Sequence, residues 1–194
     1  MRGDRRIKTW DGEFEIVPVL ILDCLWGRGM SDHLATYLND HLTGARFAVE
    51  MLGRLRDSTK DALFRRRLAE LLQQIEDDRA VLQDLVERLG APRNAIKEAG
   101  AWLAEKASRI KLHTPDEEPL STFETLEALS LGVLGKLKLW QALSLVSSDE
   151  PLLSGLNYGE LSSRARVQHD QLEAYRLEAA QAALLDTSQR SQTA

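Results

Sequence analysis

The stretch LATYLNDHLTGARFAVEMLGRLRD, residues 34–57, decides the fold of this chain. Read at alternating steps of three and four residues, it gives one continuous stripe that contains a single polar member. The stripe consists of Leu34, Leu38, His41, Ala45, Ala48, Leu52 and Leu55. This spacing places all of these side chains on one face of an α-helix, as a bundle helix requires. The stretch therefore predicts a bundle helix over about residues 32–56, with His41 facing the core.

Three further stretches carry a stripe of the same kind, and each is also interrupted by one polar residue. They predict helices over about residues 62–89, 122–146 and 160–185. The polar members of these stripes are Asp78, Ser130 and Gln168. A buried polar group needs a hydrogen-bond partner, so the four polar positions are expected to form a network that fixes the helix register.

The ends of the predicted helices carry capping residues. Ser58 is the expected N-cap of the second helix, with Asp61 favourable in its first turn. Residues 121–124, Ser-Thr-Phe-Glu, form a capping box for the third helix, and residues 157–160 cap the fourth. Gly132 and Gly135 lie inside the third helix, where we expect them to permit close approach of a neighbouring helix.

The connections between the helices predict the topology. The link after residue 57 is short, so the first two helices are expected to be antiparallel neighbours. Residues 90–119 form a long connection that includes a shorter amphipathic helix over about residues 94–110. The sequence therefore predicts an all-α protein of two antiparallel hairpins joined by a long crossover, which is the connectivity of ferritin-like bundles.

Composition narrows the function classes. Asp and Glu number 30 against 25 for Lys and Arg, which argues against a nucleic-acid-binding protein. Cys24 is the only cysteine, so the chain cannot form an internal disulfide, and we expect a cytoplasmic protein. Residues 16–26 are apolar but too short to span a bilayer, so no membrane partner is expected.

The sequence divides into three parts. Residues 1–30 are expected to be a poorly ordered extension or to lie outside the natural start, because Met30 followed by Ser31 would suit an N-terminus. The alternative is that residues 16–26 form a short extended piece packed on the domain. Residues 31–186 form the bundle domain, and residues 187–194 form a disordered polar tail.

Chain order, helix lengths and one inward polar residue per helix resemble the ferritin-like superfamily over residues 32–185. The opening helix, YLNDHLTGARFAVEML, is similar to that of small uncharacterised bacterial ferritin-like proteins. The resemblance implies a di-metal site built from Glu residues and Glu-x-x-His motifs. No Glu-x-x-His occurs in this chain, and the nearest match, Glu76-x-x-Arg79, puts a fixed cation where a metal ion would bind. The ligand set is therefore expected to be degenerate.

Matching helix levels across the first turn places His41 opposite Asp77 and Asp78, whereas Glu50 and Glu76 lie about 12 Å apart along the axis. A buried His41–Asp78 pair is therefore expected. We predict a non-catalytic interaction or scaffold protein without a cofactor that forms a homo-oligomer, most simply a dimer, and a different protein partner is also compatible. The alternative is a ferritin-like iron or manganese oxidoreductase or metal-handling protein. Its candidate ligands are His41, Glu50, Glu76, Asp78, Glu127, His169 and Glu173.

Overall fold

A computed structural model of the chain describes residues 7–8, 14–15, 19–89 and 118–185. This part of the chain is helical apart from a short antiparallel strand pair, in which Ile7 lies opposite Glu15 and Lys8 opposite Phe14. The elements are β1 (Ile7–Lys8), β2 (Phe14–Glu15), α1 (Val19–Ser58), α2 (Ala62–Arg88), α4 (Glu118–Val146), the 3-10 helix η2 (Pro151–Leu153) and α5 (Tyr158–Leu184). The predicted all-α class with four long helices is confirmed.

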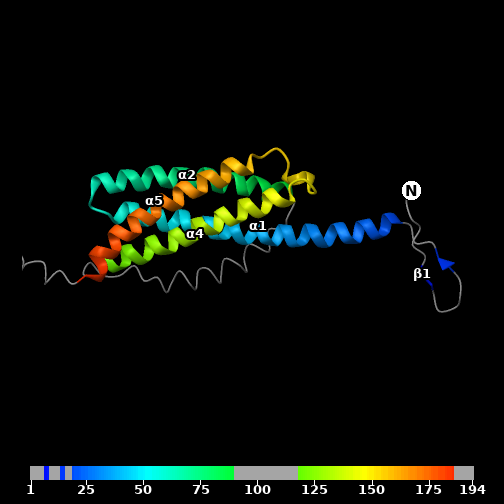
Figure 1. Cartoon of the computed structure of the whole chain (residues 1–194), viewed down its shortest axis with the longest axis horizontal. Helices are drawn as coiled ribbons and strands as arrows, with labels where there is room; N and C mark the ends of the chain where they lie inside the picture. The colour runs from blue at the N-terminus through cyan, green and yellow to red at the C-terminus, as the bar shows by residue number, and fades with distance from the viewer. Residues whose placement is uncertain (1–6, 9–13, 16–18, 90–117, 186–194) are drawn as a thin grey trace, which may run out of the picture.

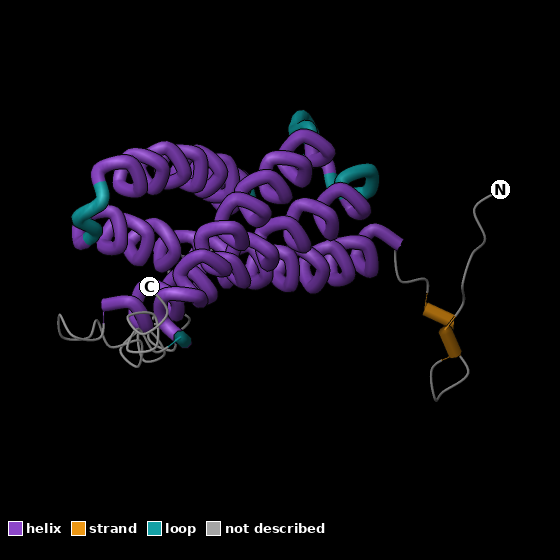
Figure 2. Tube along the Cα trace, turned by 60° about the vertical axis from the view of Figure 1, so that its left-hand side comes forward, coloured by secondary structure: helices purple, strands orange, loops and turns teal. Residues whose placement is uncertain are grey.

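The four helices are arranged as a bundle of two hairpins. Helix α1 packs against α2, α4 packs against α5, and α1 also contacts α4. Figure 2 shows the turns of the two hairpins at opposite ends of the bundle. Helix α2 ends at the opposite end of the bundle from the start of α4 (Figure 1). The predicted helix over residues 94–110 lies outside the described residues.

Helix α1 begins much earlier than the sequence predicted. It starts at Val19 rather than near Asp32, so residues 19–26 of the apolar run are helical and not extended. Pro18 directly precedes the helix, and proline is favourable at a helix start, whereas no proline follows before Ser58. The first part of α1 projects beyond the other helices in Figure 1.

The helix starts confirm one predicted cap and correct two. Asn157 caps α5 by accepting a hydrogen bond from the Glu160 amide at 3.1 Å. Asp61 rather than Ser58 caps α2, because α1 continues through Ser58, and the Asp61 carboxylate accepts from the amide of Leu63 at 2.8 Å. The predicted capping box is wrong, since α4 already begins at Glu118 and residues 121–124 lie inside it.

The core consists of two apolar clusters that follow each other along the bundle. The first contains buried residues from all four helices and from η2: Leu38, Leu42, Leu82, Leu85, Val86, Leu137, Leu139, Trp140, Leu143, Leu153, Tyr158, Leu161 and Ala165. The second, nearer the α1–α2 turn, contains Met51, Leu52, Leu55, Leu68, Leu71, Leu72, Ile75, Leu126, Leu129, Val133, Leu172 and Tyr175. The gap between the clusters falls near residue 78 on α2, residue 136 on α4 and residue 168 on α5.

Helix α4 has two unusual features. A Cβ atom added at Gly132 or Gly135 would meet nothing within 4 Å, so neither glycine serves the close internal helix contact that we expected. Among the described residues, Pro119–Val146 is also the one helix that is long and apolar enough to cross a membrane by length and composition. A core helix of a water-soluble bundle passes the same test.

Candidate functional site: a buried charge cluster around Asp78

The gap between the two apolar clusters is filled by charged and polar side chains. Asp78 of α2 is buried, and its carboxylate accepts hydrogen bonds from three side chains of the second hairpin. The Lys136 ammonium of α4 donates to Oδ2 at 2.5 Å, and the Gln168 amide of α5 donates to the same oxygen at 3.1 Å. The Arg164 guanidinium of α5 donates to Oδ1. We call these four residues the Asp78 cluster.

Two of the residues that donate to Asp78, Lys136 and Gln168, also form a hydrogen bond with each other. The Lys136 ammonium donates to the Gln168 amide oxygen, so the glutamine accepts from one member and donates to another. Arg164 and Gln168 are four residues apart and therefore lie on one face of α5. The cluster thus joins the first hairpin to the second at mid-bundle, which is the role that was predicted for a buried polar network.

The charges in the Asp78 cluster do not balance. One carboxylate faces two cations, so the cluster carries one net positive charge when all three groups are ionised. The Lys136 side chain is only 13% exposed, whereas that of Arg164 is 35% exposed. Burial lowers the pKa of Lys136 below its usual value and the neighbouring Arg164 lowers it further, although Asp78 opposes the shift. Asp78 is therefore the group of the cluster that favours the protonated form of Lys136.

His41 is not part of this cluster. The predicted His41–Asp78 contact does not form, and among the described residues His41 has no hydrogen bond. Its ring instead lies edge-on to Tyr37, with the ring centroids 4.7 Å apart. Burial lowers the pKa of His41, and Asp40 opposes that shift. The prediction failed because Leu38 and Leu42 turn fully into the core, which leaves His41 half-buried at its side.

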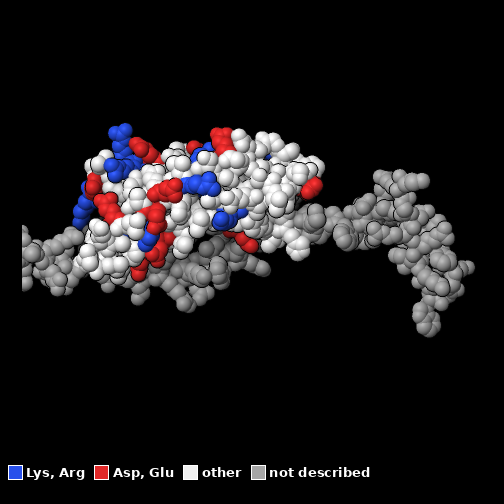
Figure 3. Space-filling model, viewed as in Figure 1, with Lys and Arg blue, Asp and Glu red and all other residues white. Residues whose placement is uncertain are grey.

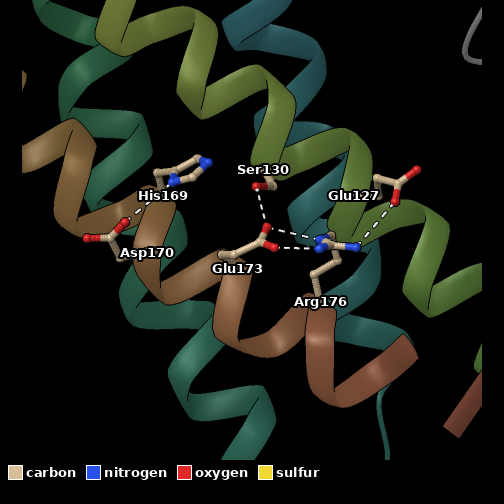
Figure 4. Close-up of polar contacts among 6 residues, drawn as sticks. All are labelled: Glu127, Ser130, His169, Asp170, Glu173 and Arg176. Carbon is tan, nitrogen blue, oxygen red and sulfur yellow. Dashed lines mark hydrogen bonds and ion pairs between the residues drawn. The ribbon is translucent and has the colours of Figure 1, made fainter. Parts of the chain in front are cut away.

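Ser130, the remaining predicted core residue, belongs to a second polar group (Figure 4). Its hydroxyl donates to the Glu173 carboxylate at 3.2 Å. Arg176 donates to the same carboxylate and, at 3.4 Å, to Glu127 of α4. The hydrogen bond from Arg176 is the main reason why the pKa of Glu173 is lowered. Glu127 and Glu173 are thus both held by a protein cation.

The other proposed metal ligands are dispersed. Glu50 is exposed and pairs with Arg54 at 3.7 Å, and Glu76 is half-buried near Arg56. His169 contacts Asp170 of the same helix at 3.4 Å, and in Figure 4 no contact joins it to the other residues drawn. In the part of the chain that the structure describes, no three His, Cys, Asp or Glu side chains come together as a metal site.

Sequence reasoning missed Lys136 and Arg164. A lysine on a predicted helix is ordinarily expected on the solvated face, which holds for Lys138 but not for Lys136. Two signals were available: Arg164 precedes Gln168 by one helical turn, and an aspartate in an apolar stripe requires a cation. The neighbouring Arg79, which was expected to be the cation at this position, has a buried Nε without a hydrogen-bond partner.

Comparison with protein-family models, with curated proteins and with solved structures finds no match for this chain. The interpretation of the site therefore depends on its own geometry.

Proposed function

We propose that this chain is a ferritin-like helical bundle with a degenerate metal site, and that it acts as a non-catalytic interaction or scaffold protein in the cytoplasm. The observation that carries the proposal is the occupation of the Asp78 carboxylate by Lys136 and Arg164. Asp78 is the only carboxylate in the gap between the two core clusters, as far as the structure describes it.

A metal ion at Asp78 would have to displace both cations. Lys136 and Arg164 offer no lone pair in their charged forms, and each repels a divalent cation electrostatically. The Lys136 side chain is also too deeply buried to move its charge into water without opening the bundle. The Asp78 cluster thus supplies from the chain itself the positive charge that a metal ion supplies in a ferritin-like di-metal site.

The remaining carboxylates support the same interpretation. Glu127 and Glu173 share Arg176, and Glu50 has its own arginine on the surface. These carboxylates are exposed or half-buried and each contacts an arginine, so among the described residues they do not converge on one metal position. Binding surfaces for other proteins would then lie on the outside of the helices, where α4 exposes several large apolar residues.

Metal analysis tests this proposal. The full chain is purified without chelators from cells grown with added iron and manganese, beside a di-iron ferritin that serves as the control for metal supply. We expect far less than one ion per chain, because the carboxylates are already paired with cations. About two tightly bound ions per chain would overturn the proposal.

A further inference from the structure

The outer face of α4 is unusually apolar. Leu131 is 65% exposed and Leu145 is 80% exposed, while the opposite face of the same helix supplies buried residues to both core clusters. On the face of the molecule seen in Figure 3, charged side chains are densest toward the end where α1 turns into α2. Helix α4 therefore exposes large apolar residues on a face that the described bundle leaves uncovered.

The exposed residues of α4 follow a heptad pattern. They fall into two series along the helix, and within each series the residues are seven positions apart. The second series is displaced from the first by three or four positions, as the two apolar positions of a coiled-coil heptad are. We define the α4 outer face by six of these residues: Leu120, Glu127, Leu131, Leu134, Lys138 and Leu145. All are exposed except Leu134, which is half-buried. The outer face thus has the spacing that a helix uses to pack against another long helix.

We propose that the α4 outer face binds the same face of a second copy of this chain, with the two α4 helices antiparallel. This inference rests on the proposed function as an interaction protein. We place the two-fold axis level with the midpoint between Gly132 and Val133. A residue a given number of positions before this midpoint then lies beside the residue the same number of positions after it in the second copy. Leu131 then faces Leu134 of the second copy, and Glu127 faces Lys138.

The outer ends of the face match in the same register. Leu120 lies level with Leu145 of the second copy, and Glu124 lies level with Gln141. Every apolar position therefore meets an apolar position, and each acidic residue meets a basic or amide group. A parallel pair would instead place Glu127 beside Glu127 and Lys138 beside Lys138, which is unfavourable. The charge pattern thus selects the antiparallel arrangement.

The charged residues of the face have little to bind within their own chain. Among the described residues, Lys138 has Gln141 as its only hydrogen-bond partner, at 3.4 Å, and forms no ion pair. Glu127 reaches Arg176 at 3.4 Å, but Arg176 is held more closely by Glu173. Lys138 is therefore free to form an ion pair with a second copy. The Glu127 side chain is 51% exposed, so its carboxylate can bind Lys138 of a second copy beside its longer contact with Arg176.

One of the two glycines of α4, Gly135, fits this arrangement. Glycine destabilises a helix interior relative to alanine, and no atom lies within 4 Å of a Cβ added at Gly132 or Gly135. The packing inside the described bundle therefore does not require glycine at either position. Small residues next to a helix contact allow close approach of the partner helix, and Gly135 lies beside Leu131 and Leu134 at the edge of the proposed contact. Gly132 lies about 100° around the helix from Leu131, outside the contact.

Charge reversal provides the sharpest test. The dissociation constant of the full-length protein is measured by sedimentation velocity for the wild type, Glu127→Lys and Lys138→Glu. Each variant places two pairs of like charges across the interface, so we expect each to weaken self-association by at least about tenfold. An equimolar mixture of the two variants pairs opposite charges again and should recover the affinity of the wild type.

Two control variants separate this effect from general changes in charge and hydrophobicity. Glu178→Lys makes the same charge change on an exposed position of α5 and should leave the dissociation constant unchanged. Leu131→Asp should abolish the dimer, whereas Val167→Asp, at a similarly exposed apolar position of α5, should not. Thermal melts followed by circular dichroism verify that each variant is folded.

Several outcomes would overturn the inference. A wild type that stays monomeric up to about 100 μM, or variants that dimerise like the wild type, would do so. So would vesicle binding that is lost in Leu131→Asp, because lipid would then cover the face. A monomer in which Leu131→Asp lowers the melting temperature more than Val167→Asp would show that the chain covers its own face.

A metal-free monomer would refute this inference alone, whereas two bound ions per chain would refute the proposed function in any oligomeric state.

Discussion

Replacing Asp78 by asparagine removes the carboxylate from the Asp78 cluster at almost constant side-chain size. Removing one partner of a buried ion pair costs about 3–5 kcal/mol. Arg164 is 35% exposed and can turn toward water, so most of the cost arises from Lys136, which is 13% exposed. The unpaired Lys136 can also lose its proton and become neutral, which sets an upper limit on this cost. Removing the proton at pH 7 from a lysine with the usual pKa of 10.5 costs about 5 kcal/mol. We therefore expect Asp78→Asn to lower the free energy of unfolding by about 3–4 kcal/mol at pH 7.

The cost of Asp78→Asn should depend on pH with a defined sign. Without the carboxylate, burial lowers the pKa of Lys136 in the folded state further below its value in the unfolded chain. Between these two pKa values the unfolded chain binds more protons, so the stability of the variant increases with pH. The difference from the wild type should therefore shrink above pH 7, by up to about 1.4 kcal/mol per pH unit.

Urea unfolding followed by circular dichroism at pH 7, 8 and 9 measures both effects. Asp77→Asn is the matched control, because Asp77 is exposed and, among the described residues, accepts a hydrogen bond from Gln73 alone, at 3.1 Å. The control should change the free energy of unfolding by no more than about 0.5 kcal/mol. Equal costs for the two variants would refute the idea that Asp78 holds Lys136 and Arg164 in the core.

Three further variants test other parts of the structure. Lys136→Met should cost less than Asp78→Asn because Asp78 keeps Arg164, and a double-mutant cycle of the two should show a coupling energy of about 0.5–3 kcal/mol; additive effects would contradict a direct contact. Asp61→Ala removes the N-cap of α2 and should lower stability by about 1 kcal/mol in urea titrations, and an unchanged midpoint would argue against the cap. Gly135→Ala should raise stability by about 0.5–1 kcal/mol, since the added methyl group meets no atom within 4 Å, and a loss of stability would reveal an unseen internal contact.

The periodicity of the sequence was sufficient to predict the helices. Stripes at alternating steps of three and four residues located all four, and the buried polar positions Asp78, Ser130 and Gln168 were correctly placed inside. A buried face dominates the pattern of a long helix, so such positions can be found without knowledge of the neighbours. The early start of α1 was missed because residues 1–30 were expected to be a poorly ordered extension, with the first helix beginning after Ser31.

The contacts within the candidate site could not be predicted in the same way. Lys136 and Arg164 extend long side chains into the core from flanking positions, whereas a stripe analysis treats charged residues as solvated. Their pairing with Asp78 also depends on the level of α4 and α5 relative to α2, and the long connection leaves that level undetermined. His41 was misplaced because α1 packs on both α2 and α4, so its buried face is wider than one stripe and includes Asn39 and Thr43.

The central claim is that the protein's own cations occupy the position at Asp78 where a metal ion would bind. An anomalous-difference map from crystals of the full chain grown with manganese tests it most directly. We predict no anomalous peak at Asp78 and electron density for the Lys136 ammonium within hydrogen-bonding distance of its carboxylate. A strong peak coordinated by Asp78, with Lys136 displaced toward solvent, would contradict the claim.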